Sequence, residues 1–342
     1  MTRPLGAGAE VRFLCPDTDL LAAVAQVDDI DSRLGKDAAL RAAFARGGTA
    51  AWTVLTWLRL REAGYGGMTI APVPAEDAIN IATAQDLQSA PWWRRAFCVA
   101  VEADFPRIWW AQLQIQQNRA NCRPGDLFMR HWPQPALIPR RDRPHGTLRV
   151  GFYGKAGGNL AGTPEAWRAM LAARGFEFHA PGVADWHDYS SIDIAVGIRS
   201  FDRRRWDKRP ASKLVNAWLA GVPFVGGMDS AFADEGRPGI DYLRVDSAEG
   251  LLDALERLRG DPSLGTALVA EGRVAARRYA ADRLVAEWAA LIEGPIAARY
   301  ARWRQRPAYE RARIALLGPG HAGWERAKRL RRRLIGRGDD AA

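Results

Sequence analysis

The feature that most constrains the fold is an alternation of short apolar segments with longer helical ones, which runs through both halves of the chain. In the first half the apolar segments predict strands at Val11–Pro16, Met68–Ala71, Ile79–Ala82, Ala96–Val101 and Leu113–Gln117. Residues 20–46 predict one or two helices, and residues 50–63 predict another, with Thr49 as its N-cap and Gly64 at its end. This alternation is typical of a parallel α/β sheet.

A second α/β unit follows a proline-rich linker. Residues 131–146 hold four prolines and show no periodic pattern, as expected between domains. The next predicted strands are Leu148–Tyr153, Phe176–His179, Ile192–Ile198 and Pro223–Gly226. The predicted helices are Pro164–Arg174, Ser212–Ala220, Ala248–Arg259, Asp261–Tyr279 and Pro295–Arg306. We therefore predict an N-terminal domain over 1–138, a C-terminal domain over 147–295 and a basic helical tail over 296–342.

Composition limits the class of protein. The 342 residues suffice for two domains, and 48% hydrophobic content supports a sizeable core. No segment reaches the ~18 consecutive apolar residues of a membrane-spanning helix, and no apolar signal core follows the N-terminus. The three cysteines (Cys15, Cys98 and Cys122) are widely spaced, which argues against a zinc site or a disulfide framework. We therefore expect a cytoplasmic protein without a metal site.

The positive charge is concentrated at one end of the chain. The net charge is +10, and residues 296–342 contribute +9 of it, from 13 Lys/Arg and four acidic residues. The body therefore carries only +1. An enzyme acting on nucleic acid usually spreads its basic residues along a groove of the body, so no nucleic-acid partner is expected.

A candidate phosphate site begins where the strand Ile192–Ile198 delivers Arg199. The carboxyl ends of strands are where ligands bind in open α/β sheets. The following loop is rich in basic residues, including Lys208. Ser212 is then predicted to cap a helix whose first turn holds Lys213, and such a helix start with nearby cations favours phosphate binding. The alternative is that these residues only cap and pack a helix.

Two further segments are predicted to complete this site. The turn after strand Pro223–Gly226 carries Asp229 and Ser230, which are suited to bind a ribose or sugar hydroxyl. The glycine-rich loop after the strand Leu148–Tyr153 carries Gly154, Lys155 and Asn159, whose backbone N–H groups and ammonium suit phosphates or a sugar. A flexible surface turn explains this loop equally well.

The sequence KLVNAWLAGVPFVGG, preceded by a strand and a basic loop, resembles the donor-binding segment of GT-B glycosyltransferases, and in particular a bacterial family with a C-terminal glycosyltransferase domain. The similarity spans roughly residues 148–293 and extends more weakly into the first half. It implies two Rossmann-like domains facing a cleft. It also implies transfer of a sugar from a nucleotide-sugar donor to a glycan or lipid-linked acceptor. The nucleotide-sugar is then a substrate, so no cofactor is expected.

The resemblance gives the donor-binding candidates their roles. Arg199, Lys208 and Lys213 would offset the diphosphate charge, which makes a metal dispensable. Asn216 stands where many retaining members have Glu, so the sequence predicts neither retention nor inversion. This departure leaves open a non-catalytic protein of the same fold that binds a nucleotide or a glycan.

An acceptor hydroxyl would need a general base in the first domain. The candidates are Asp17 after the first strand, Asp104 after strand Ala96–Val101, and His131 at the domain junction. For any one of them the alternative is a solvated loop carboxylate or a hydrogen-bonded histidine.

The basic tail is predicted to form an amphipathic helix over residues 321–335. Trp324, Ala327, Leu330 and Leu334 form its apolar stripe, surrounded by Lys and Arg. A basic amphipathic helix with a tryptophan favours a peripheral position on the inner face of the membrane. A solubilising tail and a nucleic-acid arm are the alternatives.

Overall fold

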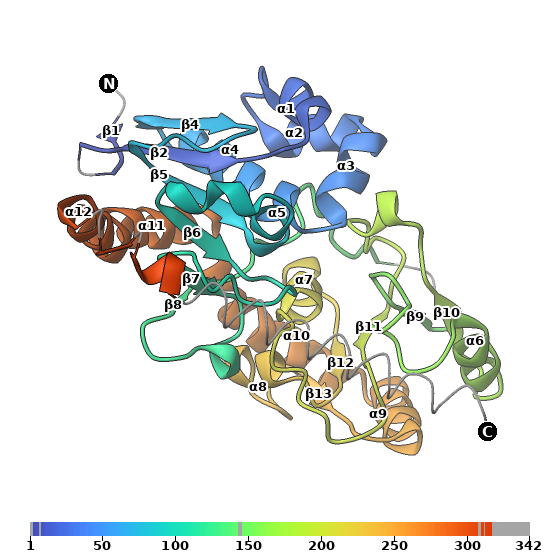
Figure 1. Ribbon diagram of the computed structural model, residues 1–342. Coiled ribbons are helices and arrows are strands. Elements are labelled where there is room, and N and C mark those ends of the chain that lie inside the picture. Colours follow the sequence, from blue (N-terminus) through green and yellow to red (C-terminus); the bar gives the residue numbers. More distant parts are fainter. Residues whose placement is uncertain (1–2, 7, 143–145, 307–308, 311, 317–342) are drawn as a thin grey trace.

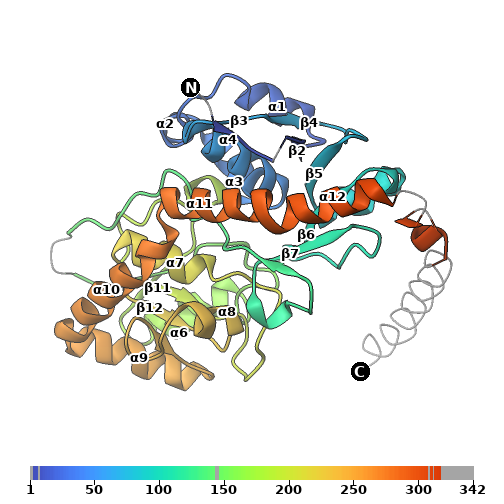
Figure 2. The same ribbon diagram turned by 90° about the vertical axis from the view of Figure 1, so that its left-hand side faces the viewer.

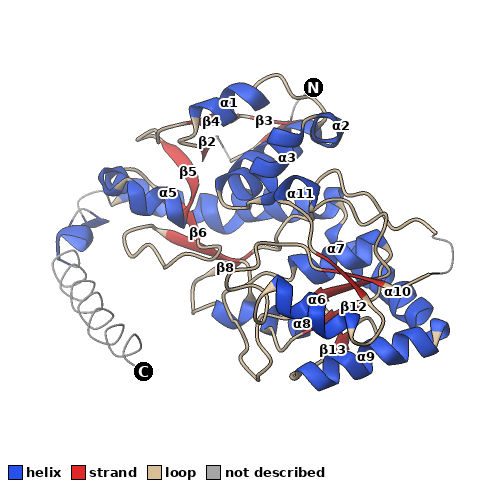
Figure 3. Ribbon diagram, turned by 90° about the vertical axis from the view of Figure 1, so that its right-hand side faces the viewer, coloured by secondary structure: helices blue, strands red, loops and turns tan. Residues whose placement is uncertain are grey.

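Two parallel sheets form the framework of the protein, and each is surrounded by helices (Figures 1 and 3). The computed structural model describes residues 3–6, 8–142, 146–306, 309–310 and 312–316. The first sheet has six strands and the second has five. A two-stranded sheet, formed by β1 (Arg3–Pro4) and β3 (Tyr65–Gly66), lies beside the first.

The first sheet has the order β4-β2-β5-β6-β7-β8, and all of its pairs are parallel. Its strands are β2 (Glu10–Leu14), β4 (Met68–Ala71), β5 (Ala78–Thr83), β6 (Cys98–Val101), β7 (Leu113–Gln116) and β8 (Leu127–Phe128). Every residue of β5 and β6 is buried, as expected for strands covered on both faces. Because β4 lies on one side of β2 and the strands from β5 onward lie on the other, the order reverses between β2 and β5, which is a Rossmann-like arrangement.

The helices of the first half are short and begin mostly at capping residues. Asp17, Asp29, Asp37 and Thr83 each accept a backbone N–H at the start of a helix. The helices are α1 (Thr18–Val24), α2 (Ile30–Lys36), α3 (Ala38–Ala45), the π-helix Ala50–Val54, α4 (Leu55–Glu62) and α5 (Ala84–Ser89), with 3-10 turns at Pro91–Arg95 and Arg119–Asn121.

The second sheet has the order β10-β9-β11-β12-β13 and is also parallel. Its strands are β9 (Arg149–Gly151), β10 (Glu177–His179), β11 (Ile194–Gly197), β12 (Phe224–Gly226) and β13 (Leu243–Arg244). The order reverses between β9 and β11. The structure therefore confirms the predicted pair of Rossmann-like α/β units.

The helices of the second half connect these strands and then return to the first half. They are α6 (Pro164–Ala172), α7 (Ser212–Ala220), α8 (Ser230–Glu235), α9 (Ala248–Gly260), α10 (Pro262–Ala276), α11 (Ala281–Leu291) and α12 (Ala297–Gln305), with 3-10 turns at Val183–Asp185 and Arg277–Tyr279. A π-helical turn at Ile292–Ile296, which contains Pro295, joins α11 to α12.

Helices α11 and α12 cross back onto the first half (Figure 2). The ring of Trp288 on α11 lies 6.4 Å from that of Trp52. The ring of Tyr300 on α12 lies 5.2 Å from that of Phe97, and Tyr300 is buried. Arg3 and Glu293 form an ion pair with an N–O distance of 3.0 Å. The C-terminal helices therefore belong to the core of the first half.

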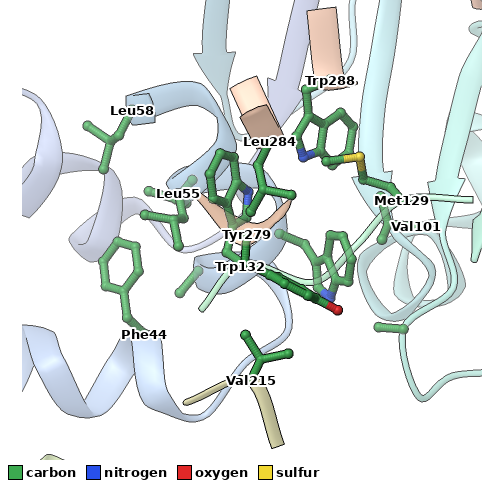
Figure 4. Packing of buried hydrophobic residues seen from close by; sticks show 14 of the residues in the cluster. Phe44, Leu55, Leu58, Val101, Met129, Trp132, Val215, Tyr279, Leu284 and Trp288 are labelled. Atoms are coloured by element: carbon green, nitrogen blue, oxygen red, sulfur yellow. The ribbon is translucent and has the colours of Figure 1, made fainter. Parts of the chain in front are cut away.

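The apolar core is continuous from one half to the other. Leu55 and Trp132 of the first half share a cluster with Val215, Tyr279 and Leu284 of the second (Figure 4). All five side chains are buried. The two sheets are therefore joined through packed side chains as well as by the linker.

Several local predictions were wrong. Residues 18–45 form three helices, because Asp29 and Asp37 cap two separate starts. Thr49 is not an N-cap, because its backbone is already helical and its hydroxyl donates to Asp86 Oδ2 at 2.6 Å. Gly64 does follow the end of α4, with a positive φ of 83°. Residues 321–335, the predicted membrane helix, lie outside the described residues.

Candidate functional site

The predicted donor residues gather at the reversal point of the second sheet. β9 is followed by the loop that contains Gly154, and Arg199 lies two residues after the end of β11. Since β9 and β11 are neighbours in the sheet and parallel, their carboxyl ends lie side by side. Ligands of doubly wound sheets bind at this kind of crevice.

Arg199 and Asp229 form a buried ion pair in the middle of this site. Arg199 Nε donates to Asp229 Oδ1 at 2.6 Å, and the two side chains are 4% and 1% exposed. Asp229 Oδ2 has no hydrogen-bond partner among the described residues. Burial raises the pKa of Asp229, while the charges of Arg199 and Lys213 oppose that rise. Arg199 Nη1 also donates to Asn159 Oδ1, which connects the glycine-rich loop to the pair.

Lys213 lies next to this ion pair, in the first turn of α7. A Cβ added to Gly154 would lie 3.2 Å from both Cε and Nζ of Lys213, so the glycine allows the loop and the lysine to approach closely. The ammonium is 5.4 Å from the ring centroid of Phe152. Burial, with a further contribution from the charge of Arg199, lowers the pKa of Lys213 to about 7. This lysine therefore becomes charged more readily when an anion binds beside it.

Other predicted donor residues lie at the edge of this group. Ser212 is the first residue of α7, Ala211 occupies the cap position, and no side chain caps this helix start. The predicted cap at Ser212 was therefore wrong. Lys155 is exposed on the glycine-rich loop. Lys208 is exposed too, and its charge opposes the rise that burial causes in the pKa of Glu102 in the first half.

Asn216 and Ser230 contact the first half of the chain in this structure. Asn216 Oδ1 accepts the backbone N–H of Gln134 at 3.0 Å. Ser230 Oγ accepts from Asn118 Nδ2 at 2.9 Å. The sugar-binding roles given to these two residues, and to Asp229, stay predictions.

The three candidate bases occupy two different places. Asp17 follows β2 and caps α1, where its Oδ1 accepts the backbone N–H groups of Asp19 and Leu20. Asp104 faces the second half, since its carboxylate accepts from Arg209 and from Gln117 Nε2. His131 lies near Asp104, whose negative charge partly offsets the lowering of the His131 pKa by burial.

The chemistry of His131 is defined by its surroundings. Its ring meets Trp52 edge-to-face with centroids 5.0 Å apart, and burial lowers its pKa. Its Nδ1 hydrogen-bonds to the carbonyl oxygen of Trp132, which only accepts, so the proton of the neutral ring is on Nδ1. Nε2 is then left as the proton acceptor, as a general base requires.

Two groups of residues near the site were missed by the sequence analysis. Gln117 and Asn118, directly after β7, are 6% and 2% exposed and bond to the second half. Glu102, directly after β6, is buried, and burial raises its pKa. Gln117 is the last residue of a predicted strand, and Asn118 and Glu102 directly follow predicted strands, so a position at a strand end was the available signal.

Two cavities lie away from the predicted site residues. A cavity of about 580 Å³ is lined by residues from Ala233 to Asp241 and from Val274 to Arg283, and another of about 420 Å³ by residues from Pro238 to Arg257. Neither is lined by a predicted site residue. Within the described ranges no three His, Cys, Asp or Glu side chains lie together as metal ligands. No helix in the described part of the chain is long and apolar enough to cross a membrane.

No protein-family model matches the chain, and no curated protein matches it. Among solved structures, HepE of Anabaena in complex with UDP and glucose is similar at 10% identity and a TM-score of 0.49, covering 82% of this chain and 98% of its own. Sucrose-phosphate synthase of Thermosynechococcus elongatus is similar at 11% identity and a TM-score of 0.46. The match covers 62% of this chain and 72% of the synthase chain.

TarM of S. aureus is similar at 11% identity and a TM-score of 0.43, with 64% of this chain covered. This chain spans only 55% of the length of TarM. At such identities and scores, the likenesses indicate nothing about substrate or chemistry.

Proposed function

We propose that the protein is a glycosyltransferase that takes a sugar from a nucleotide-sugar donor. The observation that carries the proposal is the group formed by Arg199, Lys213 and Gly154 at the reversal point of the second sheet. The charged form of Lys213 is disfavoured in the free protein, so a bound diphosphate would stabilise it. Gly154 has no side chain, so its backbone leaves room for the diphosphate beside the lysine.

In the proposed reaction, the bond between the anomeric carbon and the diphosphate oxygen breaks, and the leaving diphosphate gains negative charge. Lys213 and Arg199 stabilise that charge, and Lys208 contributes from the edge of the site. We propose that these cations make a divalent metal unnecessary, which predicts that EDTA leaves the rate unchanged.

The new bond forms between the anomeric carbon and an acceptor hydroxyl, whose proton passes to a base. His131 is the better candidate, because Nε2 is available to accept a proton. Asp104 needs first to be released from Arg209. We propose a glycan or a lipid-linked sugar as the acceptor, with one of its hydroxyls as the nucleophile.

A thermal-shift and calorimetric screen with UDP, GDP, ADP and inorganic pyrophosphate tests the donor site. Stabilisation by at least one nucleoside diphosphate, lost in Lys213→Ala but retained in Lys36→Ala, supports the proposal. Lys36 is an exposed lysine of the first half and provides the matched control. Absence of binding by the whole panel, or binding unaffected by Lys213→Ala, contradicts it.

The second candidate is a non-catalytic protein of the same fold that binds a nucleotide or a glycan. The observation that favours it is Asn216, whose side-chain oxygen is occupied by the backbone of Gln134. A turnover assay separates the two candidates. It uses the nucleotide-sugar whose nucleoside diphosphate binds most tightly and measures the release of free sugar or of a transfer product. Binding without turnover favours the second candidate.

We also propose that the protein acts at an anionic membrane surface through residues 321–335. These residues lie outside the described part of the chain, so the proposal depends on their basic amphipathic sequence. Co-sedimentation of the full chain and of a 1–318 truncation with phosphatidylglycerol vesicles tests it. Equal binding of both would contradict it.

A further inference from the structure

We propose that Asn118 is a positioning residue that, from the first half of the chain, holds the basic loop and the start of α8 around the donor site. This inference rests on the proposed function for its ligand, a nucleoside diphosphate. The inference goes beyond the proposed function because it assigns a residue of the first half to the support of the donor site in the second half.

The hydrogen bonds of Asn118 reach two separate segments of the second half. Its Nδ2 donates to the carbonyl oxygen of Arg209 at 3.0 Å and to Ser230 Oγ at 2.9 Å. Its Oδ1 accepts the backbone N–H of Ala120 at 3.0 Å. Both amide protons and one oxygen lone pair are used, and the residue is 2% exposed. A side chain bonded so completely has one fixed orientation.

Each of the two segments that Asn118 joins is close in sequence to a residue of the donor site. Arg209 ends the basic loop, only four residues before Lys213. Ser230 follows Asp229, the partner of Arg199, and its backbone N–H donates to the carbonyl oxygen of Arg205 at 2.6 Å. Asn118 therefore fixes the loop and the start of α8 relative to each other.

The neighbouring residue strengthens the same contact. Gln117 Nε2 donates to the carbonyl oxygen of Lys208 at 2.8 Å and to Asp104 Oδ1 at 2.9 Å. The loop needs such support, because Trp206 has a positive φ of 51°, which is unfavourable for a bulky side chain.

A matched control lies in the same turn. Asn121 Nδ2 donates to Gln116 Oε1 at 2.7 Å, so this amide bonds within the first half. Asn118→Ala and Asn121→Ala each remove an amide from one loop, and only the first removes bonds to the donor half. Ser230→Ala deletes one acceptor of Asn118 without changing the first half.

Calorimetry with the tightest binder among UDP, GDP and ADP gives the first measurement. We expect Kd to rise about tenfold in Asn118→Ala, because two hydrogen bonds that order the site are lost. Asn121→Ala should change Kd less than about twofold. The effects of Asn118→Ala and Ser230→Ala on Kd should be less than additive in the double variant, because the two residues share one hydrogen bond.

Hydrogen exchange without ligand gives the second measurement. We expect faster exchange at residues 203–211 and 228–232 in Asn118→Ala than in Asn121→Ala. Equal exchange in the two variants overturns the inference, and so does faster exchange with unchanged Kd. If the wild-type protein binds no nucleotide, the proposed function fails, and the exchange rates alone decide whether Asn118 holds the two segments.

Discussion

Lys213 should couple diphosphate binding to the uptake of a proton. Its pKa is lowered to about 7 by burial and by Arg199, while Asp229 and Asp104 act in the opposite direction and Arg209 adds to the lowering. At pH 8.5 a lysine with this pKa is about 97% neutral. A bound diphosphate stabilises the charged form, so the free protein must take up about one proton on binding at this pH.

The affinity for a diphosphate should therefore depend on pH. Well below pH 7 the lysine is charged before and after binding, so almost no proton is taken up. Above pH 7, binding requires protonation, and affinity falls as pH rises. If the bound lysine regains its ordinary pKa of 10.5, affinity decreases about eightfold between pH 7.5 and 8.5. The diphosphate itself changes little in this range, because phosphate monoesters titrate near ~6.

Isothermal titration in Tris and in bicine at pH 8.5 measures this uptake, because the two buffers release protons with different enthalpies. Lys213→Arg should bind without proton uptake, since arginine stays protonated, whereas Lys36→Ala should behave like the wild type. Identical heats in the two buffers together with a flat affinity from pH 7.5 to 8.5 would refute the reasoning.

Two further predictions concern stability. Asp229→Asn leaves Arg199 buried without a charged partner and should lower the free energy of unfolding in urea by about 3–5 kcal/mol. Asp246→Asn breaks an exposed ion pair and should cost under ~1 kcal/mol, so similar costs for the two would contradict the burial argument. Tyr300→Ala removes the buried ring that packs on Phe97 and should cost about 3–5 kcal/mol, and a cost below ~1 kcal/mol would show that α12 contributes little.

Much of the α/β framework was predictable because buried parallel strands are short continuous apolar runs. Met68–Ala71 and the helix Ser212–Ala220 have the predicted bounds. The two-residue strands Leu127–Phe128 and Leu243–Arg244 were not predicted, because they are too short to show a pattern. Their pairing depends on neighbours far along the chain.

The part of the donor site that depends on local sequence was predictable. Arg199 and Lys213 stand at a strand end and a helix start, which are visible in the sequence. The partners of Asn216 and Ser230 were not visible, because Gln134 and Asn118 lie in the other half. The lowered pKa of Lys213 depends on burial and on charges from four other segments, which sequence spacing does not reveal.

The return of α11 and α12 to the first half has a consequence for synthesis. The first sheet and its helices up to residue 128 leave the ribosome early. The packing partners of Trp52 and Phe97, which are Trp288 and Tyr300, are synthesised much later. The first half therefore cannot complete its fold as an independent unit before nearly the whole chain has emerged. During translation its uncovered apolar surface is prone to aggregation until these helices emerge.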